Sequence, residues 1–209
     1  MMMKKILMLA LSSLMVLGLA ACGNTNGADA SSSASKKIDT AAQAPAKGNG
    51  KTLVVYFSAG GHTKKVANYI AKATNGDVME LKPVQEYTEA DMDYNNKDSR
   101  TTRERDDASL RDIPLVKDKA DNWEGYDTVF IGYPIWWGGA AWPVDNFIKH
   151  NDFSGKTVIP FATSASSGLG NSGEELQQMA GTGNWLEGKR FPSEASESDV
   201  RQWIQSLNR

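Results

Sequence analysis

Short apolar runs alternate with amphipathic stretches along most of this chain. Residues 52–58 are rich in β-branched and aromatic side chains, as in a strand that is buried on both faces. Between 64 and 72, apolar and lysine-bearing positions separate onto opposite faces of a helix, and Asn75-Gly76 supplies a stop signal. This part of the chain is therefore predicted to fold as strand, turn and helix.

The same pattern recurs toward the C-terminus. Further strands are predicted at 78–81, 127–133 and 157–162, with a weaker one at 185–191. Helices are predicted at 144–149, 172–179 and 196–207. Strands that alternate with helices favour an α/β fold in which a parallel sheet, here of five strands, is covered by helices on both faces as a three-layer sandwich.

Residues 82–125 break the pattern, because they are long, polar and charged. A helix is expected there without a definite position. Asp91, Asp93 and Asn95 superficially resemble a calcium loop, but Asn96 and Thr102 stand where its glycine and its closing glutamate are required. The segment is instead expected to be a solvated surface of mixed charge.

The N-terminus has the pattern of an export signal. Lys4 and Lys5 precede a short apolar stretch that ends at Cys22, so residues 1–21 are predicted to be a signal peptide. The sequence Leu-Ala-Ala-Cys at 19–22 resembles the lipobox of bacterial lipoproteins, in which the cysteine is lipidated. A lipid anchor would place the protein at the bacterial cell envelope, on the outer face of the cytoplasmic membrane or at the outer membrane. The alternative is a secreted protein with an incidental cysteine.

The remaining chain divides into a tether and a domain. Residues 22–50 contain almost no large apolar side chain and are predicted to be a flexible linker, whereas 51–209 suit a single domain. Without the two signal-peptide lysines, 21 cationic residues face 25 acidic ones, a balance of −4. This balance argues against nucleic acid as a partner.

Three loops follow predicted strands at the sheet edge where open parallel sheets bind ligands. The first, 58–63, combines two hydroxyls and two glycines with the start of a helix, which favours an anion site. An ordinary capped turn is the alternative. His62 fits either contact with the anion or capping of the helix. The loop lacks the Gly-Lys-Ser/Thr ending of an ATP-binding loop.

The second loop, 134–142, carries three of the six tryptophans, and such aromatic surface needs a packing partner. A flat ligand ring is one candidate and the protein core is another, and at least one indole is expected to be core. The third loop, 163–172, is small and polar. It contains Gly168-x-Gly170-x-x-Gly173, which formally matches a dinucleotide fingerprint but follows the wrong strand.

In the residues of these three loops, the chain resembles the flavodoxin family. The segments that carry the resemblance are VVYFSAGGHTKKVA, DTVFIGYPIWWGGAAWPV and DFSGKTVIPFATSASSGLGNS, which begin at 54, 127 and 152 and look like the phosphate loop and the two loops beside the flavin ring. The resemblance implies FMN as the cofactor and a flavodoxin-like sheet of strand order 2-1-3-4-5, for which flavodoxin itself is a standard example.

The resemblance also implies the residues that contact FMN. The phosphate would be held by Ser58, Gly60, Gly61, His62 and Thr63. The ring would be lined by Pro134, Ile135, Trp136, Trp137 and Gly138, and its opposite edge would be contacted by Thr163, Ser164, Gly168 and Gly170. No side chain is required as a catalytic acid or base, and no metal is expected.

Three functions are compatible with these residues. The first is an FMN-binding carrier that exchanges electrons with a redox partner protein. The second is an FMN-dependent NAD(P)H:quinone-type oxidoreductase acting on a small flat acceptor, which is favoured by the lack of an aromatic side chain in the third loop. The third is a binding protein that kept the fold and lost the cofactor.

Overall fold

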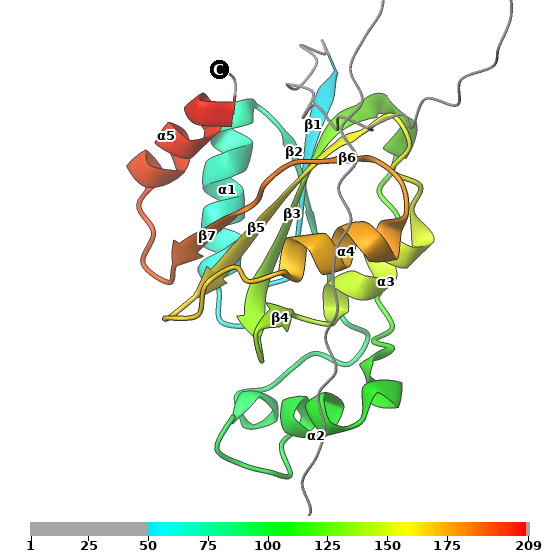
Figure 1. Cartoon of the computed structure of the whole chain (residues 1–209), viewed down its shortest axis with the longest axis vertical. Coiled ribbons are helices and arrows are strands. Elements are labelled where there is room, and N and C mark those ends of the chain that lie inside the picture. Colours follow the sequence, from blue (N-terminus) through cyan, green and yellow to red (C-terminus); the bar gives the residue numbers. More distant parts are fainter. Residues whose placement is uncertain (1–49, 208–209) are drawn as a thin grey trace, which may run out of the picture. The chain divides into compact units, whose positions relative to one another are not determined.

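The computed structural model describes residues 50–207 and places a parallel sheet at the centre of the domain (Figure 1). The strands of this part of the chain are β1 (Lys51–Tyr56), β2 (Asp77–Glu80), β3 (Tyr126–Trp136), β4 (Gly139–Ala140), β5 (Thr157–Ser164), β6 (Asn184–Trp185) and β7 (Lys189–Pro192). The α-helices are α1 (His62–Thr74), α2 (Arg100–Asp106), α3 (Pro143–His150), α4 (Ser172–Ala180) and α5 (Glu197–Leu207). The predicted signal peptide, Cys22 and the linker up to residue 49 lie outside the described residues.

The sheet has the order β2-β1-β3-β5-β6. All pairs along this path are parallel. The short strand β4 was not predicted, so β5 and β6 are the fourth and fifth of the predicted strands. The observed order is then 2-1-3-4-5, and the predicted α/β fold is confirmed. β4 is an addition, since it pairs antiparallel with the end of β3.

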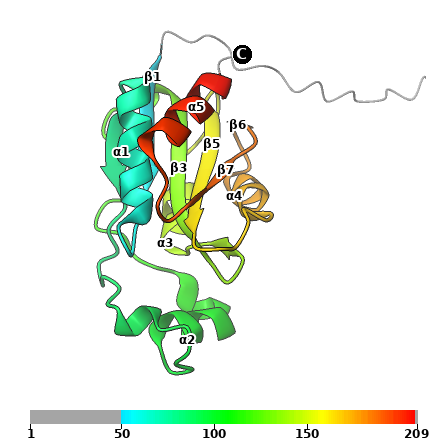
Figure 2. The same cartoon turned by 90° about the vertical axis from the view of Figure 1, so that its left-hand side faces the viewer.

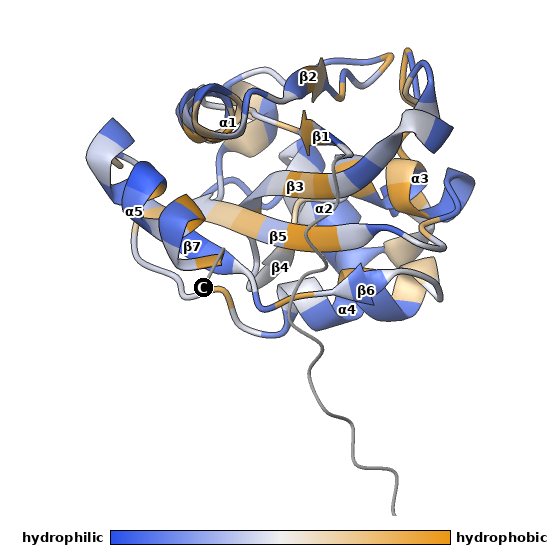
Figure 3. Ribbon diagram, turned by 90° about the horizontal axis from the view of Figure 1, so that it is seen from above, coloured by the Kyte–Doolittle hydropathy of each residue, from blue (hydrophilic) through white to orange (hydrophobic). Residues whose placement is uncertain are grey.

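Helices cover both faces of the sheet, α1 and α5 on one side and α3 and α4 on the other (Figures 1 and 2). The alternation of side chains along β1 divides its residues between two cores. Val54 and Tyr56 pack toward α1 and α5, while Val55 and Phe57 pack toward α3 and α4. Apolar residues accordingly concentrate along β3 and β5 in the middle of the sandwich (Figure 3).

The weak strand predicted at 185–191 is divided into β6 and β7, and both pair with β5. Leu186 donates its backbone N–H to the carbonyl of Val158, so the backbone groups of alternate residues of β5 face this side of the sheet. Pro160 is the next residue on that side, and it has no N–H to donate. The predicted strand is therefore found as two short strands, because the ladder is interrupted at this proline.

The part of the excursion between β2 and β3 that surrounds α2 lies beyond the carboxyl ends of the strands, and the chain then returns to the start of β3 (Figures 1 and 2). It contains α2 and three 3₁₀ turns, η1 (Ala90–Met92), η2 (Ala108–Arg111) and η3 (Trp123–Gly125). Residues 93–98 are exposed, as expected of a solvated surface. The prediction that the whole segment is solvated is wrong for one face of α2. Thr101, Thr102 and Glu104 are buried, because they face a packed interface rather than water.

Buried Glu104 holds the excursion together. Its carboxylate accepts hydrogen bonds from Arg100 Nε at 2.7 Å and from the Tyr87 hydroxyl at 2.8 Å. The pKa of the Tyr87 hydroxyl is raised, mainly by burial and in addition by its hydrogen bond to Glu104.

Among residues 50–207, no helix is both long enough and apolar enough to span a membrane.

Candidate functional site

The site is built where the chain changes from one face of the sheet to the other. β1 and β3 are neighbours, yet the helix that follows β1 packs on one face and the helix that follows β3 packs on the opposite face. The loops that leave β1, β3 and β5 therefore meet at one edge of the sheet. These are the three loops singled out in the sequence. The loops after β1 and β3 diverge to opposite faces, and such a divergence is where open parallel sheets bind ligands.

Ser58 in the first loop has an unusual side chain. Its Oγ is buried and has no hydrogen-bond partner among the described residues. A buried hydroxyl without a partner costs about 1–3 kcal/mol, so it needs an explanation. An anion seated in this loop would supply the missing acceptor.

The start of α1 is also open. Gly61 is its N-cap, with φ of +84°, and no side chain caps the helix; the first turn contains no acidic residue. The N–H groups of such a turn lack acceptors within the helix and carry partial positive charge. Because a Cβ at Gly61 would meet nothing within 4 Å, its backbone faces open space. These donors fit a phosphate group.

A buried hydroxyl pair joins the first loop to the third. Thr63 Oγ1 and Thr163 Oγ1 lie 2.8 Å apart, and both residues are buried. Two hydroxyls contain two protons, but their mutual bond uses only one of them. The pair therefore keeps one proton that can be donated to a further acceptor.

His62 does not cap α1, so the capping alternative is wrong. Its Nδ1 lies 3.0 Å from the carbonyl oxygen of Ser193 and 3.8 Å from an oxygen of Glu194, both in the segment before α5. A Cβ at Gly60 would lie 3.6 Å from the imidazole Cδ2, so the ring stands over the first loop. Contact between His62 and an anion stays a prediction.

The second loop is a tight hairpin rather than an irregular loop. β3 continues to Trp136 and returns as β4, leaving Trp137 and Gly138 as the two turn residues. Both have positive φ, +52° and +87°, as in a type I′ turn. Tryptophan is strained in this conformation, where asparagine or glycine is usual.

The indoles of this loop have different surroundings. Trp136 and Trp142 are buried core residues, and Trp136 packs against Phe57 and Tyr87, which confirms that at least one indole belongs to the core. Trp137 is 39% exposed. Arg105 lies 4.1 Å over its ring, and the ring of Tyr94 contacts it at 5.2 Å, so the excursion fixes the position of this indole.

We expect Gly138→Ala to lower the free energy of unfolding by about 1 kcal/mol, because the methyl group meets no atom within 4 Å and only the positive φ resists it. Gly125→Ala is the control, since Gly125 has equal space and no positive φ. Denaturant unfolding of both variants measures the difference. Equal stabilities would contradict the strained turn.

The third loop is held by an arginine that the sequence patterns did not single out. Arg190 of β7 donates from Nε to Ser164 Oγ and from Nη2 to the Ser164 carbonyl, both at 2.8 Å. At the other end, Ser172 Oγ donates to the Leu169 carbonyl and lies 3.0 Å from the Tyr133 hydroxyl. No motif marks Arg190, because its partner lies 26 residues away on another strand.

The second and third loops also touch. A Cβ at Gly170 would lie 3.4 Å from the carbonyl oxygen of Gly138. The structure therefore brings together three groups of predicted residues, one from each loop, at one edge of the sheet. Their contacts with a flavin stay predictions. The groups are Ser58, Gly60, Gly61, His62 and Thr63; Pro134, Ile135, Trp136, Trp137 and Gly138; and Thr163, Ser164, Gly168 and Gly170.

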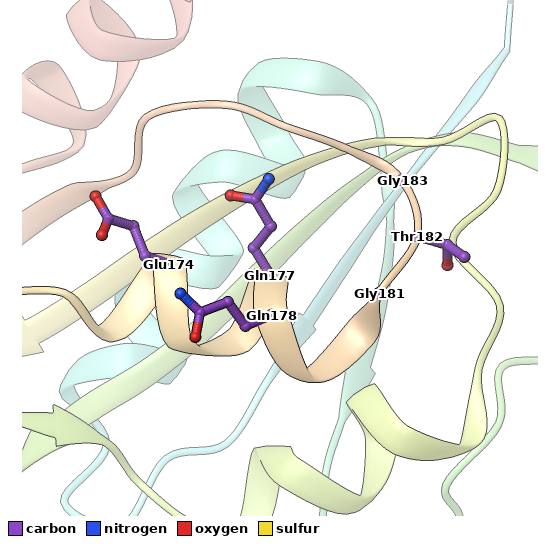
Figure 4. Close-up of a pocket in the computed structure, with 6 residues that line it drawn as sticks. All are labelled: Glu174, Gln177, Gln178, Gly181, Thr182 and Gly183. Carbon is purple, nitrogen blue, oxygen red and sulfur yellow. The ribbon is translucent and has the colours of Figure 1, made fainter.

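Another pocket is lined by α4 and the segment that follows it (Figure 4). Its lining consists of Glu174, Gln177, Gln178, Gly181, Thr182 and Gly183. It contains neither aromatic rings nor cationic groups, so it offers no surface for a flat anionic cofactor. Residues 50–207 contain no cluster of three His, Cys, Asp or Glu residues that could hold a metal ion.

Comparison with known proteins gives a family match over the whole domain. A family model described as Flavodoxin matches residues 51–207. Two solved structures described as putative flavoproteins are similar to this chain. The one from Bacteroides uniformis is 44% identical, with a TM-score of 0.69, and the match covers 75% of this chain and 98% of that chain. The one from Bacteroides eggerthii is 42% identical, with a TM-score of 0.68, and covers 76% and 98%.

A flavoprotein from Lactobacillus acidophilus, solved in complex with FMN, shares the fold. It is 24% identical, with a TM-score of 0.54, and the match covers 74% of this chain and 99% of that chain. No protein in a search of curated proteins matches. Membership of the family that this model describes supports FMN as the cofactor.

Proposed function

Because this chain belongs to the flavodoxin family, we propose that it is an FMN-binding redox protein that transfers electrons at the bacterial cell envelope. The observation that carries FMN binding is the buried Ser58 Oγ without a partner, beside the uncapped start of α1. A bound phosphate would accept hydrogen bonds from both. The hydroxyl pair of Thr63 and Thr163 would add a further donor.

The flavin supplies the redox chemistry when it is bound, and the chain supplies position and access. The hairpin at Trp137 and Gly138 would lie along the ring. Gly138 has no side chain, so its backbone can approach the ring closely. Arg190 would act through Ser164, by holding the third loop in one conformation against the other edge of the ring.

The envelope location rests on Cys22 and the apolar segment before it. We expect Cys22→Ser to move the protein from the membrane fraction to the soluble fraction of an exporting cell, because the lipid would have no attachment site. Cell fractionation with immunoblotting measures this change. If the variant stays at the membrane as the parent does, Cys22 is not the anchor.

A quinone-type reductase is the second candidate. Residues 163–171 carry no aromatic side chain, and the stretch 165–168 is exposed, so this loop offers no ring to cover a flavin. A second flat molecule would find that face open. An NAD(P)H-dependent enzyme and an electron carrier would both bind FMN, and they differ in turnover.

Absorbance spectroscopy of the purified protein tests the proposal. We expect a flavin spectrum that is bleached in a reductive titration. Steady-state oxidation of NAD(P)H with a quinone would favour the reductase, whereas reduction only by a partner protein would favour the carrier. A colourless protein that takes up no added FMN would contradict both and would support a binding protein that lost the cofactor.

A further inference from the structure

A cavity of about 450 Å³ lies at the tryptophan hairpin. Its walls come from the hairpin, from α3, from α4 and from the excursion. No residue of 58–63 or of 163–171 lines it, so it is separate from the predicted phosphate site. The lining residues are Arg105, Arg111, Trp136, Trp137, Gly138, Gly139, Ala140, Trp142, Asp145, Glu175, Leu176 and Met179.

The walls of the cavity favour a flat molecule. Three indoles line it, of which Trp137 is the accessible one, since Trp136 and Trp142 are 3% and 8% exposed; Met179 of α4 adds apolar surface. Cavities of about 300–1,000 Å³ with aromatic walls and a few polar groups are typical of small-molecule sites. The strained backbone of Trp137 is a second sign, because such strain is concentrated at functional positions.

The excursion side of the cavity carries positive charge. The guanidinium carbon of Arg105 lies 4.1 Å from the centre of the Trp137 ring. Its Nε bonds to Asp106, and its Nη groups have no acceptor among residues 50–207. Arg111 is held over Trp142 by bonds to the carbonyls of Glu104 and Arg105. Two fixed guanidiniums therefore border the same space.

The opposite side of the cavity carries two carboxyl groups, on Asp145 of α3 and Glu175 of α4. The Asp145 carboxyl group has no hydrogen-bond partner among residues 50–207, although its backbone N–H donates to the Trp142 carbonyl. Burial raises the pKa of Asp145 to about 6, against the lowering effects of Lys149 and Arg111 and with a further rise from Glu175. An anionic group in the cavity would thus be repelled from α3 and α4 and attracted to the excursion.

We propose that this cavity binds a small aromatic carboxylate, with its ring against Trp137 and its carboxylate on Arg105. The inference goes beyond the proposed function and does not require bound FMN. Because the hairpin forms a wall of the cavity and is also predicted to line the flavin ring, a ligand here would lie close to the redox centre.

Calorimetric titration of the full chain with 2-naphthoate tests the proposal, with and without saturating FMN. We expect binding in both states and at least about tenfold weaker binding of the neutral 2-naphthamide, because the charged contact to Arg105 is lost. Arg105→Met should weaken 2-naphthoate binding by a similar factor. Arg103→Met on the same helix is the control and should bind as the parent does, since Arg103 does not line the cavity.

Protonation of Asp145 gives an independent readout. We expect 2-naphthoate to bind about threefold tighter at pH 5 than at pH 7, because the repelling charge is lost as the pH falls through the raised pKa of Asp145. Asp145→Asn should remove most of this dependence. Three results would each overturn the proposal: no binding of 2-naphthoate, equal affinity for the amide, or displacement of 2-naphthoate by FMN. The last would place the probe in the flavin site and would leave FMN binding itself intact.

Discussion

Replacing Ser58 by Ala together with Thr63 by Val is expected to weaken FMN binding at least about tenfold while the domain stays folded. Ser58 Oγ is buried without a partner, and Thr63 shares its hydroxyl bond with Thr163. Each hydrogen bond to a charged phosphate is worth about 1.5–3 kcal/mol, so the loss of two gives more than a tenfold change. Fluorescence titration of the flavin-free protein with FMN measures it.

Thr74→Val is the control for this effect. Thr74 lies at the opposite end of α1, and its hydroxyl donates to the Ile70 carbonyl, far from the first loop. We expect this variant to bind FMN as the parent does. Circular dichroism of the double variant verifies that the fold survives. A folded double variant with unchanged FMN affinity would remove the phosphate assignment.

Glu104→Ala is expected to lower the free energy of unfolding by about 3 kcal/mol, because it leaves the Arg100 cation without its partner in a buried place. The Arg100 and Glu104 side chains are only 12% and 4% exposed, and their charged atoms lie 2.7 Å apart. The Tyr87 hydroxyl would lose its acceptor as well. Chemical denaturation measures the loss, and hydrogen exchange should locate it in residues 82–125.

The same helix contains a matched control, since Arg105 and Asp106 are also 2.7 Å apart but have side chains that are 39% and 60% exposed. Water and salt screen such a pair, so Asp106→Ala is expected to leave the unfolding midpoint unchanged. If both alanine variants were equally stable, burial of Glu104 would not be what holds the excursion in place.

The fold could be predicted from the sequence because each element repeats its pattern locally. The apolar run at 52–58 and the helical spacing after it correspond to β1 and α1, and the alternation that follows gives a sheet with two cores. The limits of the elements depend on tertiary contacts. The split between β6 and β7 arises from Pro160 on the neighbouring strand, which the 185–191 segment does not reveal.

The candidate site could be predicted only in part. Small residues and hydroxyls at 58–63 have a local signature, because glycine and a helix start make an anion site within six residues. The hairpin has no such signature, since tryptophan at a positive-φ position is rare and its contacts with Arg105 and Tyr94 come from the distant excursion. Arg190 likewise reaches Ser164 only through the pairing of β5 with β7.

A crystal structure of the protein soaked with FMN tests the central claim most directly. We expect the phosphate to lie within hydrogen-bonding distance of Ser58 Oγ and the first N–H groups of α1, and the ring to lie along Trp137 and Gly138. A flavin bound elsewhere, or a phosphate that leaves Ser58 Oγ without an acceptor, would contradict it.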